Sequence, residues 1–277
     1  MTLRVGHIAY ANCIPFFHHL AASGFSGRIV SGVPSELNRL LAIGELDISP
    51  SSSFEYGRNW SEYCLFPDLS ISSIGAVRSV LLFSHVPLKR LAEKPIAMTG
   101  ESATSVNLLR ILLQEFLGFH DEVSLQTQVS VEESIAAGDN GLLIGDRALR
   151  ASLSPIAPYV FDLGELWKDF TGLPFVFALW IIGIRASETK NRALAILQKQ
   201  LRASLERTLC DPARTASEVS GYNWFGERNL AEYWRAVSYD FSPAHREGLE
   251  LFFRLAEKHR LLPGKPELRF FEEAEII

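Results

Sequence analysis

The chain has 277 residues, of which 47% are hydrophobic and 21% charged, a composition typical of a folded protein with an ample core. Its formal net charge of -5 disfavours a nucleic-acid partner, because there is no basic excess to displace counterions. The cysteines Cys13, Cys64 and Cys210 are widely spaced and contain no CxxC pair. They predict neither a disulfide framework nor a zinc site.

The N-terminal residues lack the pattern of a signal peptide, since Arg4 precedes an apolar run that is broken by His7, Asn12 and Pro15. The longest apolar run, residues 175–182, has the length of a strand and not of a membrane span. We therefore expect a cytoplasmic protein with no membrane partner.

Residues 5–16, VGHIAYANCIPF, predict a short strand, a polar turn that contains Asn12 and a helix that Pro15 opens. A strand that enters a helix through a polar turn presents free backbone N–H groups at the carboxyl end of a sheet. Open α/β folds bind ligands at that edge. Taken alone, the stretch also fits an ordinary strand, turn and helix in which Asn12 is only a cap.

The rest of the chain alternates strands and helices. The expected strands lie at 27–30, 46–49, 75–84, 95–99, 142–145 and 175–184. Long amphipathic helices are expected at 35–43, 106–117, 161–172 and 187–210, with shorter ones around Ala216, Leu230 and Arg246. Ser52 and Glu55 have the spacing of a capping box for a further helix. The tail 271–277 is predicted to be a terminal strand or a frayed end.

Two segments, 35–56 and 130–150, share the order helix, stop, strand, loop, helix. Two similar α/β lobes explain this order better than one continuous sheet, although chance similarity of two units gives the same pattern. The apolar runs 79–84 and 175–182 bracket the middle segment as crossover strands. We therefore predict one lobe from 1–84 and 178–277, and a second lobe from 85–177.

Three loops each follow a strand and open a helix, at residues 10–15, 51–53 and 100–105. Helix N-termini carry partial positive charge, and serine or threonine hydroxyls add donors, so such loops bind carboxylate or phosphate without lysine or arginine. Loops of both lobes would together suit a small molecule with two anionic groups. Each loop taken singly is also explained as a helix cap.

Signals of other catalytic chemistry are weak. The seven histidines show no metal-ligand spacing, and the GxSxG, GxGxxG and P-loop patterns do not occur. Asp146 follows a buried strand, where it suits either substrate orientation or the N-cap of the next helix. Arg58 and Arg78 offer fixed positive charges, or are solvated surface residues.

Six segments in order resemble the chorismate dehydratase family, the MqnA-type enzymes that open the futalosine route to menaquinone. They are VGHIAYANCIPF, SSSFEY, GAVRSVLLFS, TGESATSVNLLRILL, LLIGDRAL and DLGELWKDFTGLPFVFALW. The resemblance runs from the first strand to about Trp180. It implies an α/β fold of the two-lobed type II periplasmic-binding-protein-like class, with a ligand cleft between the lobes.

The resemblance also implies an activity, the dehydration of chorismate to 3-[(1-carboxyvinyl)oxy]benzoate without a cofactor or metal. Asn12 is the expected catalytic residue. The expected substrate-binding residues are side chains with a hydroxyl or carboxylate group: Ser52, Ser53, Ser79, Thr104, Ser105 and Asp146. The sequence leaves open which of Ser51, Ser52 and Ser53 contacts the ligand, and it does not give the oligomeric state.

Two other functions are compatible with this fold. One is a non-catalytic module that binds or senses a small anion, although exported receptors carry signal peptides and sensors usually carry a helix-turn-helix, and neither is recognised here. The other is the sister enzyme 1,4-dihydroxy-6-naphthoate synthase, which usually opens with a serine, cysteine and proline loop that this chain lacks.

Overall fold

The computed structural model describes residues 2–100, 102–119, 123–154 and 156–274. The chain forms two compact units. Unit 1 comprises Met1–Ile71, Ala178–Ser242 and Pro266–Ile277. Unit 2 comprises Ser72–Phe177 and Pro243–Lys265.

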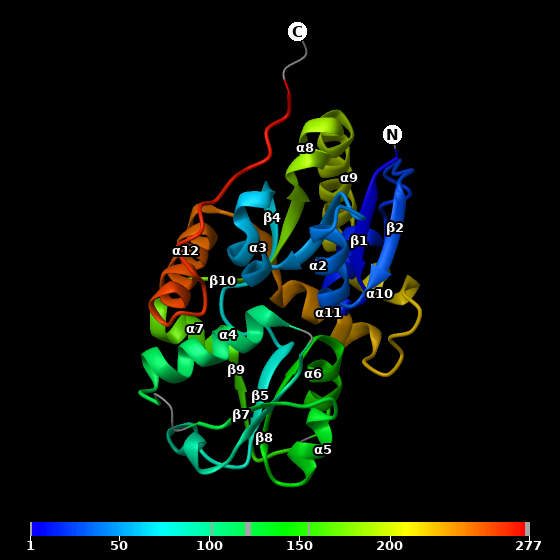
Figure 1. The fold of residues 1–277 in the computed structure, drawn as a ribbon. Coiled ribbons are helices and arrows are strands. Elements are labelled where there is room, and N and C mark those ends of the chain that lie inside the picture. The colour runs from blue at the N-terminus through cyan, green and yellow to red at the C-terminus, as the bar shows by residue number, and fades with distance from the viewer. Residues whose placement is uncertain (1, 101, 120–122, 155, 275–277) are drawn as a thin grey trace. The chain divides into compact units, whose positions relative to one another are not determined.

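The described strands of unit 1 form a six-stranded mixed sheet in the order β11-β4-β10-β3-β1-β2 (Figure 1). Their bounds are β1 (Arg4–Ile8), β2 (Arg28–Gly32), β3 (Ile48–Ser52), β4 (Tyr63–Ser73), β10 (Phe175–Gly183) and β11 (Ser238–Asp240). Strand β1 pairs in parallel with both β2 and β3, whereas β10 pairs with β3 in the antiparallel sense. Both β4 and β10 extend into unit 2 by a few residues.

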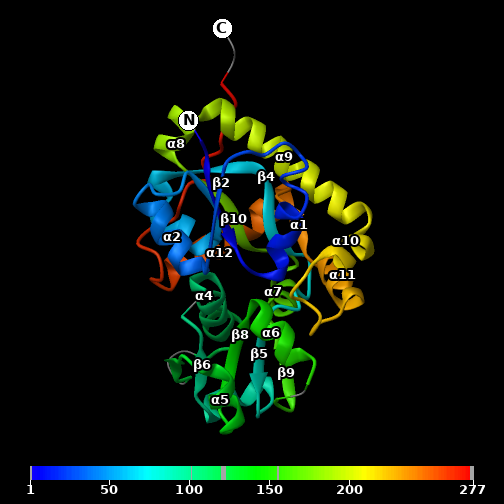
Figure 2. The same ribbon diagram turned by 90° about the vertical axis from the view of Figure 1, so that its right-hand side faces the viewer.

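Helices accompany this sheet, and α1 packs against the long helix α9 (Figure 2). The helices are α1 (Ile14–Phe17), α2 (Pro34–Ala42), α3 (Ser53–Asn59), α8 (Ile184–Thr189), α9 (Asn191–Cys210), α10 (Pro212–Glu218) and α11 (Glu227–Ala236). The predicted apolar stripe of α9 is confirmed, since Leu194, Leu197, Leu201 and Leu205 are all buried. Burial of this stripe, and not helix propensity alone, stabilises the helix.

Aromatic side chains form the centre of unit 1. The ring of Phe16 on α1 lies edge-on to Trp180 of β10 at 5.2 Å and to Tyr239 of β11 at 5.3 Å. These edge-to-face contacts add to the hydrophobic effect of burying the rings. In addition, the indole Nε1 of Trp234 donates a hydrogen bond to the carbonyl oxygen of Ala11 at 2.8 Å. Helix α11 is thereby tied to the turn that carries Asn12.

The described strands of unit 2 form a five-stranded sheet in the order β7-β6-β8-β5-β9. Their bounds are β5 (Val80–Ser84), β6 (Ile96–Met98), β7 (Leu125–Thr127), β8 (Asn140–Ile144) and β9 (Tyr159–Asp162). The accompanying helices are α4 (Ala103–Ile111), α5 (Val131–Ala136), α6 (Gly145–Ser152), α7 (Leu163–Thr171) and α12 (Pro243–Lys258). One π-helical turn, Leu112–Phe116, continues α4 along the predicted apolar stripe.

The predicted lobe boundary at Ser84 is wrong. Strand β5 pairs with β8 and β9 inside the sheet of unit 2, and the chain passes between the units through β4, a strand that the sequence analysis did not predict. A continuous apolar run such as 80–84 indicates a buried strand, but it does not show to which sheet the strand belongs. The chain returns to unit 1 at Ala178.

The predicted assignment of the C-terminal helix is also wrong, because α12 belongs to unit 2. Its Phe252 lies edge-on to Phe175 at 5.1 Å and to Trp167 at 6.4 Å. Gly248 allows this approach, since a Cβ at that position would collide with the carbonyl oxygen of Pro174. An amphipathic pattern shows that a helix has a buried face without showing what covers it. In the tail, Phe270 forms a bridge with Leu65, and residues 275–277 lie outside the described part of the chain.

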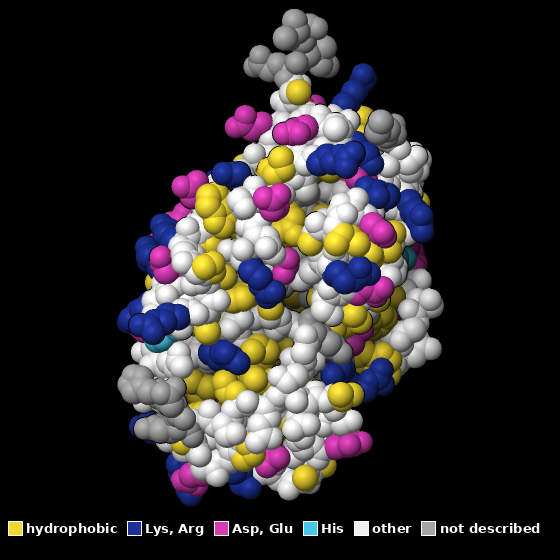
Figure 3. All heavy atoms as spheres, viewed as in Figure 1, with side chains coloured by type: hydrophobic (Ala, Val, Ile, Leu, Met, Phe, Trp, Pro, Cys, Tyr) yellow, Lys and Arg dark blue, Asp and Glu magenta, His cyan; other side chains and the backbone are white. Residues whose placement is uncertain are grey.

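Basic and acidic side chains are interspersed on the face shown in Figure 3. Such mixing leaves this face without an extended field of one sign. Within the described residues, no helix is both long and apolar enough to cross a membrane.

A buried carboxylate joins three segments of unit 1. Asp47, just before β3, receives hydrogen bonds from the backbone N–H and the guanidinium of Arg4 at 2.7 and 2.8 Å and from Nζ of Lys190 at 2.7 Å. Its side chain is only 4% exposed. Burial alone raises the pKa of Asp47, but the hydrogen bonds from Arg4 and Lys190 outweigh it and hold the pKa below its ordinary 3.8.

We predict that Asp47→Asn destabilises the protein by about 3 kcal/mol, because Lys190 and Arg4 lose a buried counter-charge. Since the folded-state pKa of Asp47 is depressed, its contribution is complete above pH 3.8 and is lost as the pH falls through the folded-state value. Urea unfolding of wild type and variant from pH 7 downward measures both effects. Glu273→Gln, which breaks the exposed pair with Lys199, is the control and should change little.

Candidate functional site

Two polar turns of unit 1 lie at the same edge of its sheet. Strand β1 runs into the short 3-10 turn Ala11–Cys13, which contains Asn12, and β3 runs directly into α3 at Ser52 and Ser53. Because β1 and β3 are parallel neighbours, their carboxyl ends and the helix N-termini that follow lie side by side. The fold thus brings together the Asn12 turn and the Ser51–Ser53 run, which the sequence separates by almost 40 residues.

The side-chain amide of Asn12 is incompletely hydrogen-bonded. Its turn is closed by a hydrogen bond from the N–H of Cys13 to the carbonyl of Tyr10 at 3.0 Å. The oxygen Oδ1 of Asn12 is buried and has no hydrogen-bond partner among the described residues. An unpaired buried amide oxygen costs about 1–3 kcal/mol, so this atom is suited to accept a hydrogen bond from a ligand or a water molecule.

The hydroxyls of the serine run differ in their partners, although all three residues are buried. Ser52 is the N-cap of α3, as predicted, and its Oγ accepts from the N–H of Glu55 at 3.1 Å. In a complete capping box the Glu55 carboxylate would accept from the N–H of Ser52. Here it instead accepts from Nδ2 of Asn59 at 2.7 Å. Ser51 Oγ has no partner within the described chain. The hydroxyl oxygen of Ser52 therefore already accepts a hydrogen bond from α3. Ser51 becomes a further candidate for ligand contact.

The predicted residues of unit 2 also meet at one sheet edge. Strands β6 and β8 are parallel neighbours, so the N-termini of α4 and α6, with Thr104, Ser105 and Asp146, share that edge. Ser79 precedes the antiparallel strand β5 and reaches the same edge, where its carbonyl accepts from the N–H of Gly145 at 2.8 Å. Residue 101 of the predicted loop lies outside the described residues.

The N-cap of α4 is Ser102. Its Oγ accepts from the N–H of Ser105 at 3.2 Å and donates to Oγ of Ser105 at 3.0 Å. Thr104 and Ser105 lie in the first turn and are 1% and 3% exposed. Their hydroxyls are therefore not required as the helix cap.

Asp146 does not cap α6, so the predicted capping role is wrong. The helix starts at Gly145 immediately after β8, and Ile144 occupies the N-cap position without a side-chain cap. The chain turns from strand to helix without a loop because Gly145 takes a φ of 54°. Asp146 instead lies in the first turn, where its negative charge faces the positive end of the helix dipole.

A buried carboxylate that the sequence analysis did not single out organises the segment before Ser79. Asp162 accepts hydrogen bonds from the backbone N–H groups of Val77 at 3.1 Å, Arg78 at 2.6 Å, Gly164 at 2.9 Å and Glu165 at 3.2 Å. It caps α7 and at the same time fixes Arg78, whose φ of 65° is left-handed. Burial raises the pKa of Asp162, and the four N–H donors counteract that effect.

A cavity of 410 Å³ lies beside the carboxyl end of β1, within unit 1. Aromatic and polar side chains line it, among them His7, Tyr10, Phe17, His18 and Tyr222. The ring of His7 packs on Phe17 with centroids 4.2 Å apart, and burial lowers the pKa of His7. The imidazole is therefore favoured in its neutral form, which can both donate and accept a hydrogen bond.

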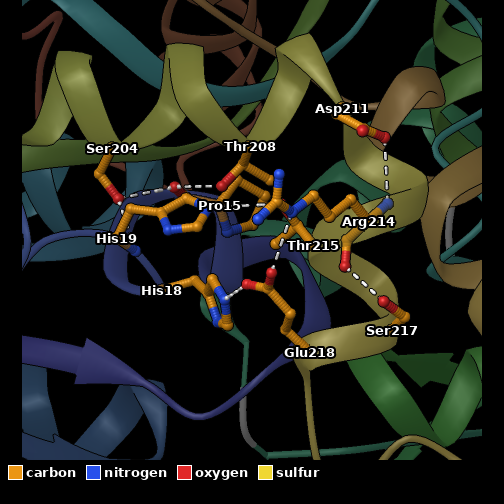
Figure 4. A network of polar contacts seen from close by, with 10 residues as sticks. All are labelled: Pro15, His18, His19, Ser204, Thr208, Asp211, Arg214, Thr215, Ser217 and Glu218. Atoms are coloured by element: carbon orange, nitrogen blue, oxygen red, sulfur yellow. Dashed lines mark hydrogen bonds and ion pairs between the residues drawn. The ribbon is translucent and has the colours of Figure 1, made fainter.

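Among the described residues, one group of side chains has the composition of a metal site. One ligand atom each of His18, His19 and Glu218 lies within 4.8 Å of the others (Figure 4). The sequence analysis could not find this group, because Glu218 is 200 residues away from the histidine pair. It shares only His18 and Glu218 with the cavity beside β1.

Comparison with known proteins gives both a family and a fold. A family model described as menaquinone biosynthesis matches residues 3–258. A chorismate dehydratase of Thermus thermophilus is 41% identical over 186 residues, which cover 62% of this chain and 66% of that protein. A chorismate dehydratase of Campylobacter jejuni is 30% identical over 179 residues, covering 62% and 64%. The matched part thus spans slightly less than two thirds of the length of these curated relatives.

Solved structures with low sequence identity share the fold. A protein of Archaeoglobus fulgidus superposes with a TM-score of 0.74 at 16% identity, covering 94% of this chain and 98% of its own. The periplasmic aliphatic sulphonate binding protein SsuA of Escherichia coli has a TM-score of 0.71 at 13% identity, covering 100% and 94%. The predicted fold class, α/β of the periplasmic-binding-protein type, is confirmed.

We predict that Asp162→Ala destabilises the protein by about 3 kcal/mol or more, since it leaves buried backbone N–H groups without an acceptor. Asp162→Asn retains one acceptor oxygen and should cost less. Denaturant unfolding measures both variants against Asp169→Ala, a control on α7 itself. A loss below about 1 kcal/mol for Asp162→Ala would show that the segment 77–79 does not depend on this carboxylate.

Proposed function

The chain belongs to the menaquinone biosynthesis family, as its resemblance indicated, and from this membership we propose that it dehydrates chorismate to 3-[(1-carboxyvinyl)oxy]benzoate. The ring carbon that bears the enolpyruvyl ether loses a proton, and the neighbouring carbon loses its hydroxyl, so that one water leaves. The electrons of the broken C–H bond form the new double bond. The ring becomes aromatic, which drives the elimination without a change in redox state.

The features of the two sheet edges support a dianionic substrate. Chorismate carries two carboxylates, and each unit offers an edge at which helix N-termini and hydroxyls gather: Ser52 and Ser53 in unit 1, Ser79, Thr104 and Ser105 in unit 2. Backbone N–H groups and hydroxyls bind carboxylates in such positions with no need for a lysine or arginine. We assign these five residues, together with Asp146, to substrate binding.

Asn12 is the residue that we assign to catalysis. An amide cannot remove a proton, but it offers a donor and an acceptor in one rigid plane. In the proposed mechanism it holds either the departing hydroxyl or the enolpyruvyl carboxylate, and this carboxylate of the substrate accepts the ring proton. The enzyme then contributes position and polarity to a reaction that the substrate itself drives.

The observation that carries the proposal is the match to the family over residues 3–258, with two chorismate dehydratases among the relatives. The orphaned Oδ1 of Asn12 at the edge of unit 1 adds a local reason, since a ligand there would satisfy it. We place the reaction in the cytoplasm, in keeping with three cysteines that form no disulfide with one another.

The competing function is a module that binds a small anion without changing it, and the fold shared with SsuA favours this second candidate. Purified protein incubated with chorismate, followed by mass spectrometry, separates the two. The dehydratase yields a product lighter by one water. Saturable binding of chorismate with no such product would establish the binding module instead.

We predict that the double variant Thr104→Ala, Ser105→Ala weakens chorismate binding by about 1–3 kcal/mol, the range for lost hydrogen bonds to a charged group. Helix α4 should persist, because its cap Ser102 and its apolar stripe are unchanged. The measurement is KM together with the circular dichroism of the variant. Ser152→Ala, at the opposite end of α6, serves as the control, and an unchanged KM in the double variant would remove these hydroxyls from the substrate site.

For Asn12 we predict that Asn12→Ala lowers kcat at least about 100-fold, the effect of removing one well-placed hydrogen-bonding group from a transition state. Asn12→Asp should fall as steeply, because it adds a negative charge beside an anionic substrate. Asn229→Ala on α11 is the matched control. Turnover near that of the wild type in folded Asn12→Ala would exclude Asn12 from the mechanism.

A further inference from the structure

Two consecutive histidines of unit 1 face a glutamate from the far end of the chain. His18 and His19 follow α1, and Glu218 is the last residue of α10 (Figure 4). Nε2 of His18 lies 3.1 Å from Oε2 of Glu218, and the two imidazole rings are edge-to-face at 4.5 Å. One nitrogen of each imidazole and one carboxylate oxygen lie within 4.8 Å of one another.

The backbone that carries the histidines is firmly held. The N–H of His19 donates to Oγ of Ser204 at 3.2 Å, and the hydroxyls of Ser204 and Thr208 on α9 donate to the carbonyl of Pro15 at 3.2 and 3.3 Å. These contacts are buried. The backbone of the histidine pair is therefore fixed by α9, and the ring of His19 also contacts α10, since its Nε2 lies 3.3 Å from Oγ1 of Thr215.

Glu218 is oriented from its own helix. Oε1 accepts from Nε of Arg214 at 3.3 Å, one turn earlier in α10, while Oε2 points to His18 (Figure 4). One oxygen is thus held by an outer partner, and the other is presented to the histidines. Metal-ligating carboxylates in proteins commonly have this division of roles.

The geometry points to a site for a divalent first-row transition metal, of which Zn²⁺ is the best probe, with His18, His19 and Glu218 as its protein ligands. Two imidazoles and one carboxylate are a known ligand set of zinc, which leaves a fourth position for water. Bonds of about 2.0–2.1 Å in tetrahedral geometry place ligand atoms about 3.3 Å apart. The pair of His18 and Glu218 already has this spacing, and a ring nitrogen of His19 lies within 4.8 Å of both ligand atoms.

Access to the site and its chemical role follow from its surroundings. Cavities of 410 Å³ and 260 Å³ flank the group, the first lined by His18 and Glu218 and the second by His19 and Glu218. Metal and water can therefore reach it from two sides. Because His18 and His19 follow α1 and Glu218 ends α10, the metal acts as a clip that holds α10 to the turn after α1.

A similar histidine–glutamate pair without a second histidine offers an internal control. In unit 2, Nε2 of His259 lies 2.9 Å from Oε2 of Glu115, and Nζ of Lys258 lies 2.8 Å from both carboxylate oxygens. The ammonium group takes the place that a second imidazole has in unit 1. An ordinary ion pair of this kind should not bind zinc.

The test is a Zn²⁺ titration of metal-free protein by calorimetry, with metal content after gel filtration and thermal unfolding as second and third readouts. All proteins carry Cys210→Ser, so that this exposed thiol, which lines the 260 Å³ cavity, does not compete for the metal. We expect one equivalent of Zn²⁺ and a rise in Tm of roughly 3 °C at saturation. His18→Ala, His19→Ala and Glu218→Gln should each weaken binding at least about tenfold, and His259→Ala should leave it unchanged.

Either of two results overturns the proposal. The first is that protein with His18, His19 and Glu218 intact does not bind one equivalent of Zn²⁺. The second is binding that survives in His18→Ala and Glu218→Gln, since the metal would then sit elsewhere. Visible absorption of bound Co²⁺ gives an independent check, because its intensity reports four-coordinate geometry and should disappear in the same variants.

Discussion

The arrangement of both units depends on parallel strand pairs whose carboxyl ends lead, directly or through a short turn, to helix N-termini. In unit 1 the pair is β1 and β3, and in unit 2 it is β6 and β8. Parallel pairing makes the two turns of each pair neighbours, and each helix start adds unpaired N–H groups with a partial positive charge. This one constraint places amide and hydroxyl side chains from distant parts of the sequence at a common edge, and it does so twice.

The polar side chains at these edges differ in whether they already have a hydrogen-bond partner. Ser52 and Ser102 satisfy helix N-termini, and Asp162 satisfies four backbone N–H groups. Asn12 Oδ1 and Ser51 Oγ are buried with no partner among the described residues. A buried polar atom without a partner is costly, so a ligand or a water molecule that binds to either atom would stabilise the protein.

The same fold serves proteins with different functions, and similarity of fold alone does not assign one. The sulphonate binding protein SsuA has this fold at 13% identity. Family membership over residues 3–258 favours the proposed dehydration over simple binding. The His18, His19 and Glu218 group lies outside that chemistry, and the clip that we infer there concerns stability.

Local patterns of the sequence determined the family and most of the elements, but not the long strand β4. Alternation of apolar runs, the stripe of α9 and the cap at Ser52 each depend on neighbours within a few residues, and the structure confirms them. Tertiary packing alone decided which sheet β5 joins, what covers α12, that Ile144 and not Asp146 precedes α6, and that Glu218 meets His18. Those outcomes depend on contacts between residues far apart in the chain, where many partners satisfy the same hydrophobic pattern and only the packed fold selects one.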